Sequence, residues 1–107
     1  MSTEKVTDEL LKELESKHQR VCHLRGRDGG WEVVFRRPTR QEYKRFKASM
    51  HNPQLAPDAQ EQLARQCVVH PSKEAFDALL EDFPAIPEAA SEAFSRLMGL
   101  AVEADTK

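Results

Sequence analysis

The chain has 107 residues, the length of one domain, and 39% of them are hydrophobic while 32% are charged. That balance is typical of a globular domain, and a chain of this length can bury a core without relying on metals or disulfides. The apolar runs are far shorter than the ~20 residues that a membrane-spanning helix needs, and the polar first residues predict no secretory signal. We expect a single domain over 1–107, frayed at 1–5 and 103–107.

The net charge of −2 conceals an asymmetry along the chain. Residues 1–54 carry 12 Lys or Arg against 8 Asp or Glu, whereas residues 55–107 carry 4 against 10. Opposite charge on the two halves favours the steering of charged partners or head-to-tail self-association. Cys22 and Cys67 are expected to be free thiols, because nothing marks the chain as extracellular, although one disulfide between them stays compatible with the sequence.

The first half of the chain predicts a helix followed by a β-hairpin. Leucine and valine recur at helical spacing, so a helix is expected from residue 3 or 7 to 17. Two β-branched and aromatic segments, 20–25 and 31–36, flank the sequence GRDGG, whose Asp-Gly pair favours a tight turn. Trp31, Val33 and Phe35 share one face of the second strand. A lone hairpin is marginal in water, so this face must pack on helices or on a further strand.

The next helix is predicted from its start signal. Thr39 and Glu42 have the spacing of a capping box, which satisfies the first free amides of a helix ending near residue 50. The apolar stripe of this helix consists of Tyr43, Phe46 and Met50.

Three more helices are expected in the second half. Asp58 is expected to cap a helix that runs to about residue 69, with His70 at its end. Ser72 caps the next helix, which Pro84 stops, and Pro87 starts the last one. The last helix turns inward Ala90, Phe94, Leu97, Met98 and Ala101. The chain is therefore predicted to be a mainly helical α+β domain, with an N-terminal helix, one β-hairpin and then about four short helices.

The sequence contains several residues of the types that bind metals. Cys67 and His70 have the spacing of metal ligands, and Cys22 and His23 offer two more. Neighbouring strand residues point to opposite faces, however, so Cys22 and His23 do not share one ion, and we predict neither a metal site nor a cofactor. The sequence contains no nucleophile elbow, phosphate-binding loop or zinc-protease helix. We therefore predict no catalytic residue and expect the protein not to be an enzyme.

A basic patch follows the hairpin, and its side chains alternate with aromatic ones. It consists of Arg36, Arg37, Arg40, Lys44, Arg45 and Lys47. Such a mixture can neutralise phosphates and stack bases. The aromatic residues have the spacing of core residues, however, and a net negative chain is not typical of a dedicated nucleic-acid binder. We expect a protein partner and no membrane partner, with a small nucleic-acid-binding or regulatory protein that uses this basic patch as the alternative.

Three segments carry a family resemblance: FRRPTRQEYKRF at 35–46, LARQCVVHP at 63–71 and LLEDFP at 79–84. Over residues 31–100 the chain resembles the small tail assembly chaperones of long-tailed bacteriophages or prophages. The resemblance implies a viral protein without catalytic residues. Such a chaperone binds the tape-measure protein in the cytoplasm of the bacterial host before the tail tube polymerises. The tail-tube protein is a further candidate partner.

A chaperone for a helical client needs apolar surface between its own helices. The candidates for partner binding are the apolar stripes of the last two predicted helices: Phe76, Leu79, Leu80, Phe83, Phe94, Leu97 and Met98. Each of these residues also has the spacing of an ordinary core residue, so the folded structure decides which of them a partner can reach.

Overall fold

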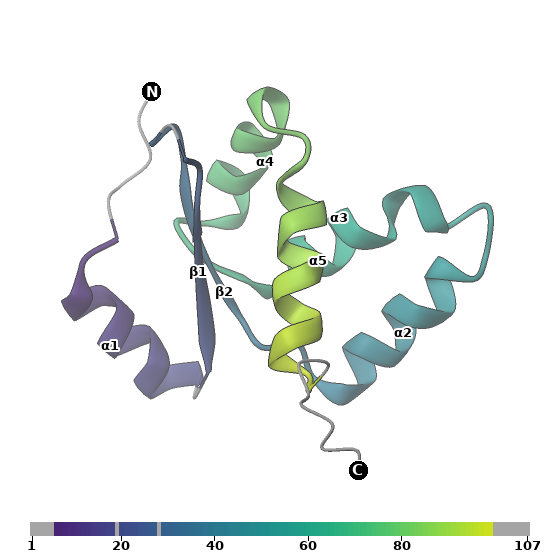
Figure 1. Ribbon diagram of the computed structural model, residues 1–107, viewed down its shortest axis with the longest axis horizontal. Coiled ribbons are helices and arrows are strands. Elements are labelled where there is room, and N and C mark those ends of the chain that lie inside the picture. Colours follow the sequence, from purple (N-terminus) through teal and green to yellow (C-terminus); the bar gives the residue numbers. More distant parts are fainter. Residues whose placement is uncertain (1–5, 19, 28, 100–107) are drawn as a thin grey trace, which may run out of the picture.

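In the computed structural model, the described residues are 6–18, 20–27 and 29–99, and they form five helices and a three-stranded antiparallel sheet (Figure 1). The elements in chain order are α1 (Asp8–His18), β1 (Val21–Arg25), β2 (Glu32–Arg36), α2 (Arg40–Met50), α3 (Ala56–Cys67), β3 (Val68–His70), α4 (Lys73–Asp82) and α5 (Ile86–Leu97). The mainly helical α+β fold is therefore confirmed. The predicted frayed ends and Ala101 lie outside the described residues.

The predicted hairpin is present, and its turn fixes how β1 and β2 pair. Gly29 has a φ of +76°, which glycine adopts without a steric penalty. The Gly26 amide donates a hydrogen bond of 3.0 Å to the Trp31 carbonyl, which closes the turn. The strands then pair antiparallel, with Val21 opposite Arg36.

The predicted helix through residue 69 is wrong at its end, because Val68–His70 form β3 instead. β3 pairs antiparallel with β2, with Val68 opposite Phe35 and His70 opposite Val34. Two successive β-branched valines favour extended backbone, and β2 offers an unpaired edge on the side away from β1. The strand order β1-β2-β3 therefore places β2 in the centre of the sheet.

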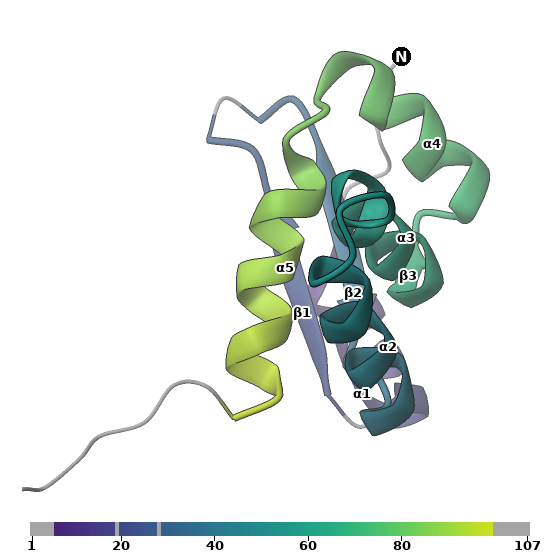
Figure 2. The same cartoon turned by 90° about the vertical axis from the view of Figure 1, so that its right-hand side faces the viewer.

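Helices cover both faces of this sheet. α1 lies on one side of the hairpin and α3, α4 and α5 lie on the other, as Figures 1 and 2 show from two directions. Val33 and Phe35 are fully buried on the side of the later helices. Val34 points the opposite way and is also fully buried, and α1 contributes its own buried residue, Leu14. Consecutive residues of β2 thus belong to the interior.

Three aromatic rings join the sheet to the C-terminal helices. The ring of Phe35 in β2 lies 5.6 Å from that of Phe76 in α4, at an interplanar angle of 90°. It lies 5.3 Å from the ring of Phe94 in α5, at 88°. Edge-to-face pairs of this kind contribute about 0.5–1.5 kcal/mol each beyond the burial of their surface. This trio therefore positions α4 and α5 on the sheet.

Of three helix caps predicted from the sequence, the structure confirms two and contradicts one. The Thr39 hydroxyl accepts a hydrogen bond from the Glu42 amide, and the Glu42 carboxylate accepts one from the Thr39 amide, so the capping box is confirmed. Ser72 caps α4 through a 3.0 Å bond from a first-turn amide. The predicted cap at Asp58 is wrong, because α3 begins two residues earlier. Asp58 lies in the first turn of α3, where a carboxylate complements the helix dipole.

α2 and α3 form a helical hairpin that extends to the side of the sheet (Figure 1). No residue of α2 is buried. Tyr43 and Phe46 are half-buried, and Met50 is 42% exposed. The predicted apolar stripe of this helix is therefore covered only in part, and Met50 lies on the surface. α2 packs chiefly against α3, and a single neighbouring helix does not cover the whole stripe.

Candidate binding surfaces

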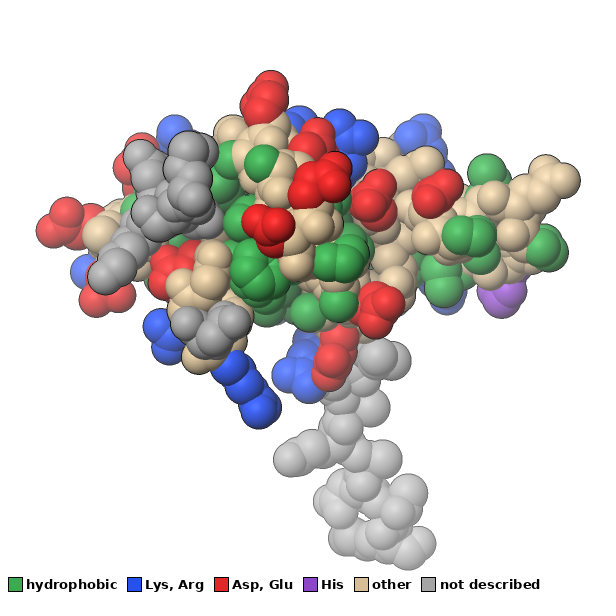
Figure 3. All heavy atoms as spheres, turned by 90° about the horizontal axis from the view of Figure 1, so that it is seen from above, with side chains coloured by type: hydrophobic (Ala, Val, Ile, Leu, Met, Phe, Trp, Pro, Cys, Tyr) green, Lys and Arg blue, Asp and Glu red, His purple; other side chains and the backbone are tan. Residues whose placement is uncertain are grey.

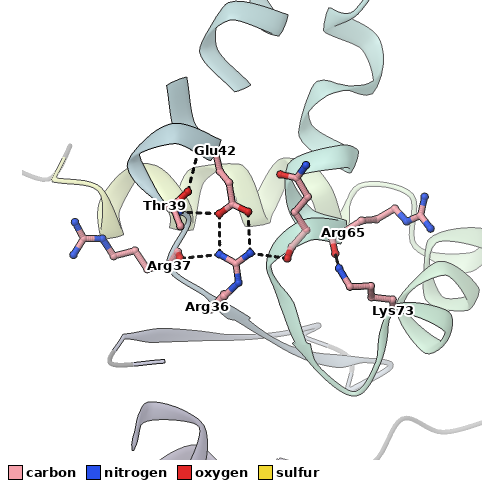
Figure 4. Close-up of polar contacts among 7 residues, drawn as sticks. Arg36, Arg37, Thr39, Glu42, Arg65 and Lys73 are labelled. Atoms are coloured by element: carbon pink, nitrogen blue, oxygen red, sulfur yellow. Dashed lines mark hydrogen bonds and ion pairs between the residues drawn. The ribbon is translucent and has the colours of Figure 1, made fainter. Parts of the chain in front are cut away.

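Arg36 is the first residue of the predicted basic patch, and it is engaged inside the protein. Its guanidinium donates to the two carboxylate oxygens of Glu42 at 2.8 and 2.9 Å (Figure 4). It also donates to the backbone carbonyls of Arg37 at 3.3 Å and Gln66 at 3.0 Å. Arg36 therefore joins the end of β2 to the start of α2 and the end of α3. The expectation that it belongs to a free basic surface is wrong.

The contact between Arg36 and Glu42 shifts the pKa of both side chains. The hydrogen bonds from Arg36 lower the pKa of the Glu42 carboxyl from 4.5 to about 2, and the Thr39 amide acts in the same direction. The hydrogen bonds to Glu42 raise the pKa of the Arg36 guanidinium further. The pair is therefore fully ionised at neutral pH. Bidentate contacts of this kind are stronger than ordinary hydrogen bonds, so this pair is a structural clamp, which we call the Arg36–Glu42 clamp.

The other five residues of the basic patch remain on the surface. Arg37, Arg40, Lys44, Arg45 and Lys47 are all exposed. Among the described residues, none of their side chains has a carboxylate partner. Their aromatic neighbours Tyr43 and Phe46 pack on each other instead, with ring centroids 5.9 Å apart. The surface of α2 is therefore cationic, and it does not present a stack of free aromatic rings.

The predicted partner-binding residues fall into two groups. Phe76 and Phe94 are 0% and 1% exposed, so they are core residues and offer no surface to a partner in this conformation. The remaining five are half-buried and partly accessible: Leu79, Leu80, Phe83, Leu97 and Met98. The structure brings Phe83, at the end of α4, against Trp31, with ring centroids 6.4 Å apart. Leu97 is the last residue of α5.

A groove runs between the outer strand β1 and α5. Cys22 and Leu24 are alternate residues of β1 and share the sheet face that meets α5. Ala89, Ala93 and Leu97 are four residues apart on one side of α5 and form the opposite wall. The alanine side chains are small, so the groove keeps a volume of about 450 Å³. Most of its lining is apolar, and the charged residues in it are Arg20, Glu92 and Arg96, so it suits an amphipathic partner segment.

Polar residues border this groove at one end. Arg20 precedes β1, and Arg96 lies in the last turn of α5. Arg96 is paired with Glu92 one turn earlier, at 2.9 Å. An apolar floor with a charged border is the usual composition of a protein interface.

The cysteines do not supply a nucleophile. Cys22 and Cys67 are free thiols. Burial raises the pKa of Cys22 to about 11 and that of Cys67 to about 12. A thiol reacts as its thiolate, so both are protonated and inert at neutral pH. Cys22 therefore acts as a small apolar group in the groove wall.

A polar contact lies on the opposite face of the sheet. Glu32 accepts a 2.7 Å hydrogen bond from the Val6 amide, and the same carboxylate oxygen lies 3.8 Å from Nε2 of His23. This contact ties the segment before α1 to β2. Within the ranges 6–18, 20–27 and 29–99, no group of three or more His, Cys, Asp or Glu could hold a metal ion. Of the described helices, none is both long and apolar enough to cross a membrane.

Two comparisons place the chain among known proteins. The model of the family described as a domain of unknown function (DUF6848) matches residues 14–107, so the chain belongs to that family. The fold is similar to the solved structure of the uncharacterised protein rbstp2171 from Bacillus stearothermophilus, with a TM-score of 0.72 and 23% sequence identity. The similarity covers 91% of this chain and 99% of the other, and it concerns the fold alone. No curated protein matches the chain.

Most residues of the groove were not predicted from the sequence. Leu97 was among the predicted partner-binding residues, but Cys22, Leu24, Ala89 and Ala93 were not. Two signals were present in the sequence: alternation of apolar residues along β1, and small residues one turn apart on α5. Neither shows that α5 lies beside β1, because that placement depends on the packing of Phe94 against the sheet.

Proposed function

We propose that this protein is a non-catalytic assembly chaperone that binds a phage tail tape-measure protein in the host cytoplasm before the tail tube forms. The observation that carries the proposal is the apolar groove between β1 and α5. The family resemblance of residues 31–100 points to the same role. A helical client laid into the groove would hide its apolar face from water, which keeps such a client from aggregating.

The groove has the right chemistry for this task. Aliphatic, alanine and thiol groups make up most of its lining, with the charged Arg20, Glu92 and Arg96 beside them, and one wall belongs to an outer strand of the sheet. The fully buried Phe35, Phe76 and Phe94 hold α5 on the sheet. A partner therefore meets a preformed surface and does not have to order it, which lowers the cost of binding.

The test is co-expression with a tape-measure protein encoded in the same gene neighbourhood. The wild-type chain is expected to co-purify with the client and to increase its soluble fraction. Ala89→Arg places a long charged side chain in the groove and is expected to abolish co-purification. Ala78→Arg is the matched control, because Ala78 is an exposed alanine of α4 that does not line the groove. A client that is equally soluble alone, or a complex that survives Ala89→Arg, would contradict the proposal.

A second candidate function rests on the five exposed cations of the basic patch, Arg37 just before α2 and the four within it. Their lack of carboxylate partners among the described residues favours the binding of a polyanion such as a nucleic-acid backbone. Under this candidate, the wild type shifts generic DNA or RNA at low salt, and Arg40→Glu with Arg45→Glu abolishes the shift. Lys12→Glu with Arg25→Glu makes the same charge change at exposed positions outside α2 and is the control. A shift that both double variants retain would exclude α2 as the site.

A further inference from the structure

The apolar surface of the groove continues beyond its upper end, which is the end near Leu24 and the hairpin turn. Leu24 lines the groove, and Trp31 lies on the same face of the hairpin, diagonally across from it. Trp31 is half-buried and packs against Phe83, the residue that ends α4. Leu80 is half-buried on the same core. Trp31, Leu80 and Phe83 all pack against the same core, and Figure 3 shows a central hydrophobic area on the face that includes α4 and the start of α5.

Several carboxylates border this patch, and basic side chains also lie near its edges (Figure 3). Figure 3 shows acidic side chains around the central hydrophobic area. Glu81 and Asp82 end α4 next to Phe83, and Glu88 lies in the first turn of α5. All three are exposed, and none has a cationic partner within the described residues.

The charge at the end of α4 is unfavourable for the isolated protein. The last turn of α4 contains no basic residue, whereas those of α1, α2, α3 and α5 each contain one or more. Negative charge at a helix C-terminus opposes the helix dipole, and Glu81 and Asp82 also repel each other. A cation supplied from outside would relieve both effects. The lower end of the groove differs, because Arg20 is exposed there and Arg96 is already paired.

The apolar surface and the exposed carboxylates beside it would complement a segment that is apolar on one face and basic at its borders. Resting on the proposed function, we infer that the client segment is an amphipathic helix whose apolar face is bordered by Lys or Arg. Its apolar face covers the groove and the Trp31–Phe83 patch, and its cations lie beside Glu81, Asp82 and Glu88. A second copy of this chain fits less well. The cations of its α2 border a stripe that is well exposed only at Met50, because Tyr43 and Phe46 are half-buried and pack on each other.

The single tryptophan of the chain makes the inference measurable. Two tryptophan-free helical peptides of about 18 residues, long enough to span the groove, would share one leucine stripe. One carries Lys beside the stripe and the other carries Glu. The emission of Trp31 is expected to report binding of the basic peptide at least about tenfold tighter at low salt, and added salt should shrink the difference.

The control variants separate charge from apolar contact. Glu81→Lys with Asp82→Lys is expected to reverse the preference, and it removes the repulsion at the end of α4, so the variant should fold at least as well. Glu15→Lys with Glu61→Lys makes the same charge change at exposed positions of α1 and α3 and should leave the preference unchanged.

Each remaining outcome decides against the inference in a different way. Equal binding of the two peptides would overturn the charge complementarity and leave the apolar groove standing. No binding of either peptide, with a client that still co-purifies, would overturn the inference alone; without co-purification, the proposed function fails as well. Sedimentation that shows self-association abolished by the Glu81 and Asp82 double variant would identify a second copy as the occupant and overturn the inference.

Discussion

α5 and α2 have similar lengths and similar apolar stripes, yet they differ in how they are held. α5 turns Ile86, Ala90 and Phe94 into the core, where they are 0–2% exposed. α2 buries no residue, and the Arg36–Glu42 clamp and its capping box fix its start. Helical spacing thus shows which side of a helix faces inward, whereas the depth of burial depends on what lies opposite. α5 packs against both α3 and the ring of Phe35 in the sheet, whereas α2 chiefly packs against α3 alone.

The largest loss of stability is expected in α5, the more deeply buried of the two helices. Phe94→Ala removes a fully buried ring from the aromatic trio, which should lower the free energy of unfolding by about 3–5 kcal/mol. Phe46→Ala in α2 should cost about half as much, since that ring is half-buried. Urea denaturation of the two variants beside the wild type measures both. Equal losses would show that α2 is as well buried as α5.

The Arg36–Glu42 clamp should give the next largest effect. Glu42→Gln keeps the shape of the side chain and removes its charge, which should cost about 2 kcal/mol of stability. The folded protein holds the pKa of Glu42 at about 2, below its ordinary 4.5. The contribution of the clamp is therefore fully present above pH 4.5 and is lost as the pH falls toward 2. The difference in stability between wild type and variant should shrink across that window. A difference that is constant between pH 7 and pH 2.5 would contradict the ionised clamp.

The cap of α2 should matter less. Thr39→Ala removes the hydroxyl that accepts the Glu42 amide, at an expected cost of about 1 kcal/mol. Because Glu42 also accepts the Thr39 amide, the costs of Thr39→Ala and Glu42→Gln should not add in the double variant. Strict additivity in thermal or urea denaturation would indicate that the clamp and the cap act independently.

The smallest effect is expected at the tip of the α2–α3 hairpin. Met50 and Leu55 are 42% and 50% exposed. Met50→Lys and Leu55→Lys should each change the free energy of unfolding by no more than about 0.5 kcal/mol. A loss of more than about 2 kcal/mol in either variant would mean that this tip is covered in solution.

The comparison also explains which parts of the fold the sequence could predict. The hairpin, the capping box and the Ser72 cap are local, because each depends on residues within a few positions of one another. β3 was missed because a strand of three residues acquires its identity only from its pairing with β2. The burial of Val34 depends on α1 lying across the sheet, which no local pattern of β2 reveals.

The candidate site was less predictable for the same reason. Arg36 looked like one cation among six, and its engagement depends partly on the carbonyl of Gln66, thirty residues away. Phe76 and Phe94 have the same spacing as the half-buried members of their stripes, so periodicity could not assign them to the core. The groove exists only because α5 lies beside β1.

Hydrogen exchange of the free protein and of its complex with the tape-measure client tests the central claim most directly. A client in the groove should slow exchange of the amides of β1 and α5 by roughly tenfold or more when binding is near saturation, and should leave those of α2 unchanged. Because α2 carries the cations and α5 lines the groove, the two regions report on different partners. Slower exchange confined to α2, with β1 and α5 unaffected, would contradict the claim that the groove binds the client.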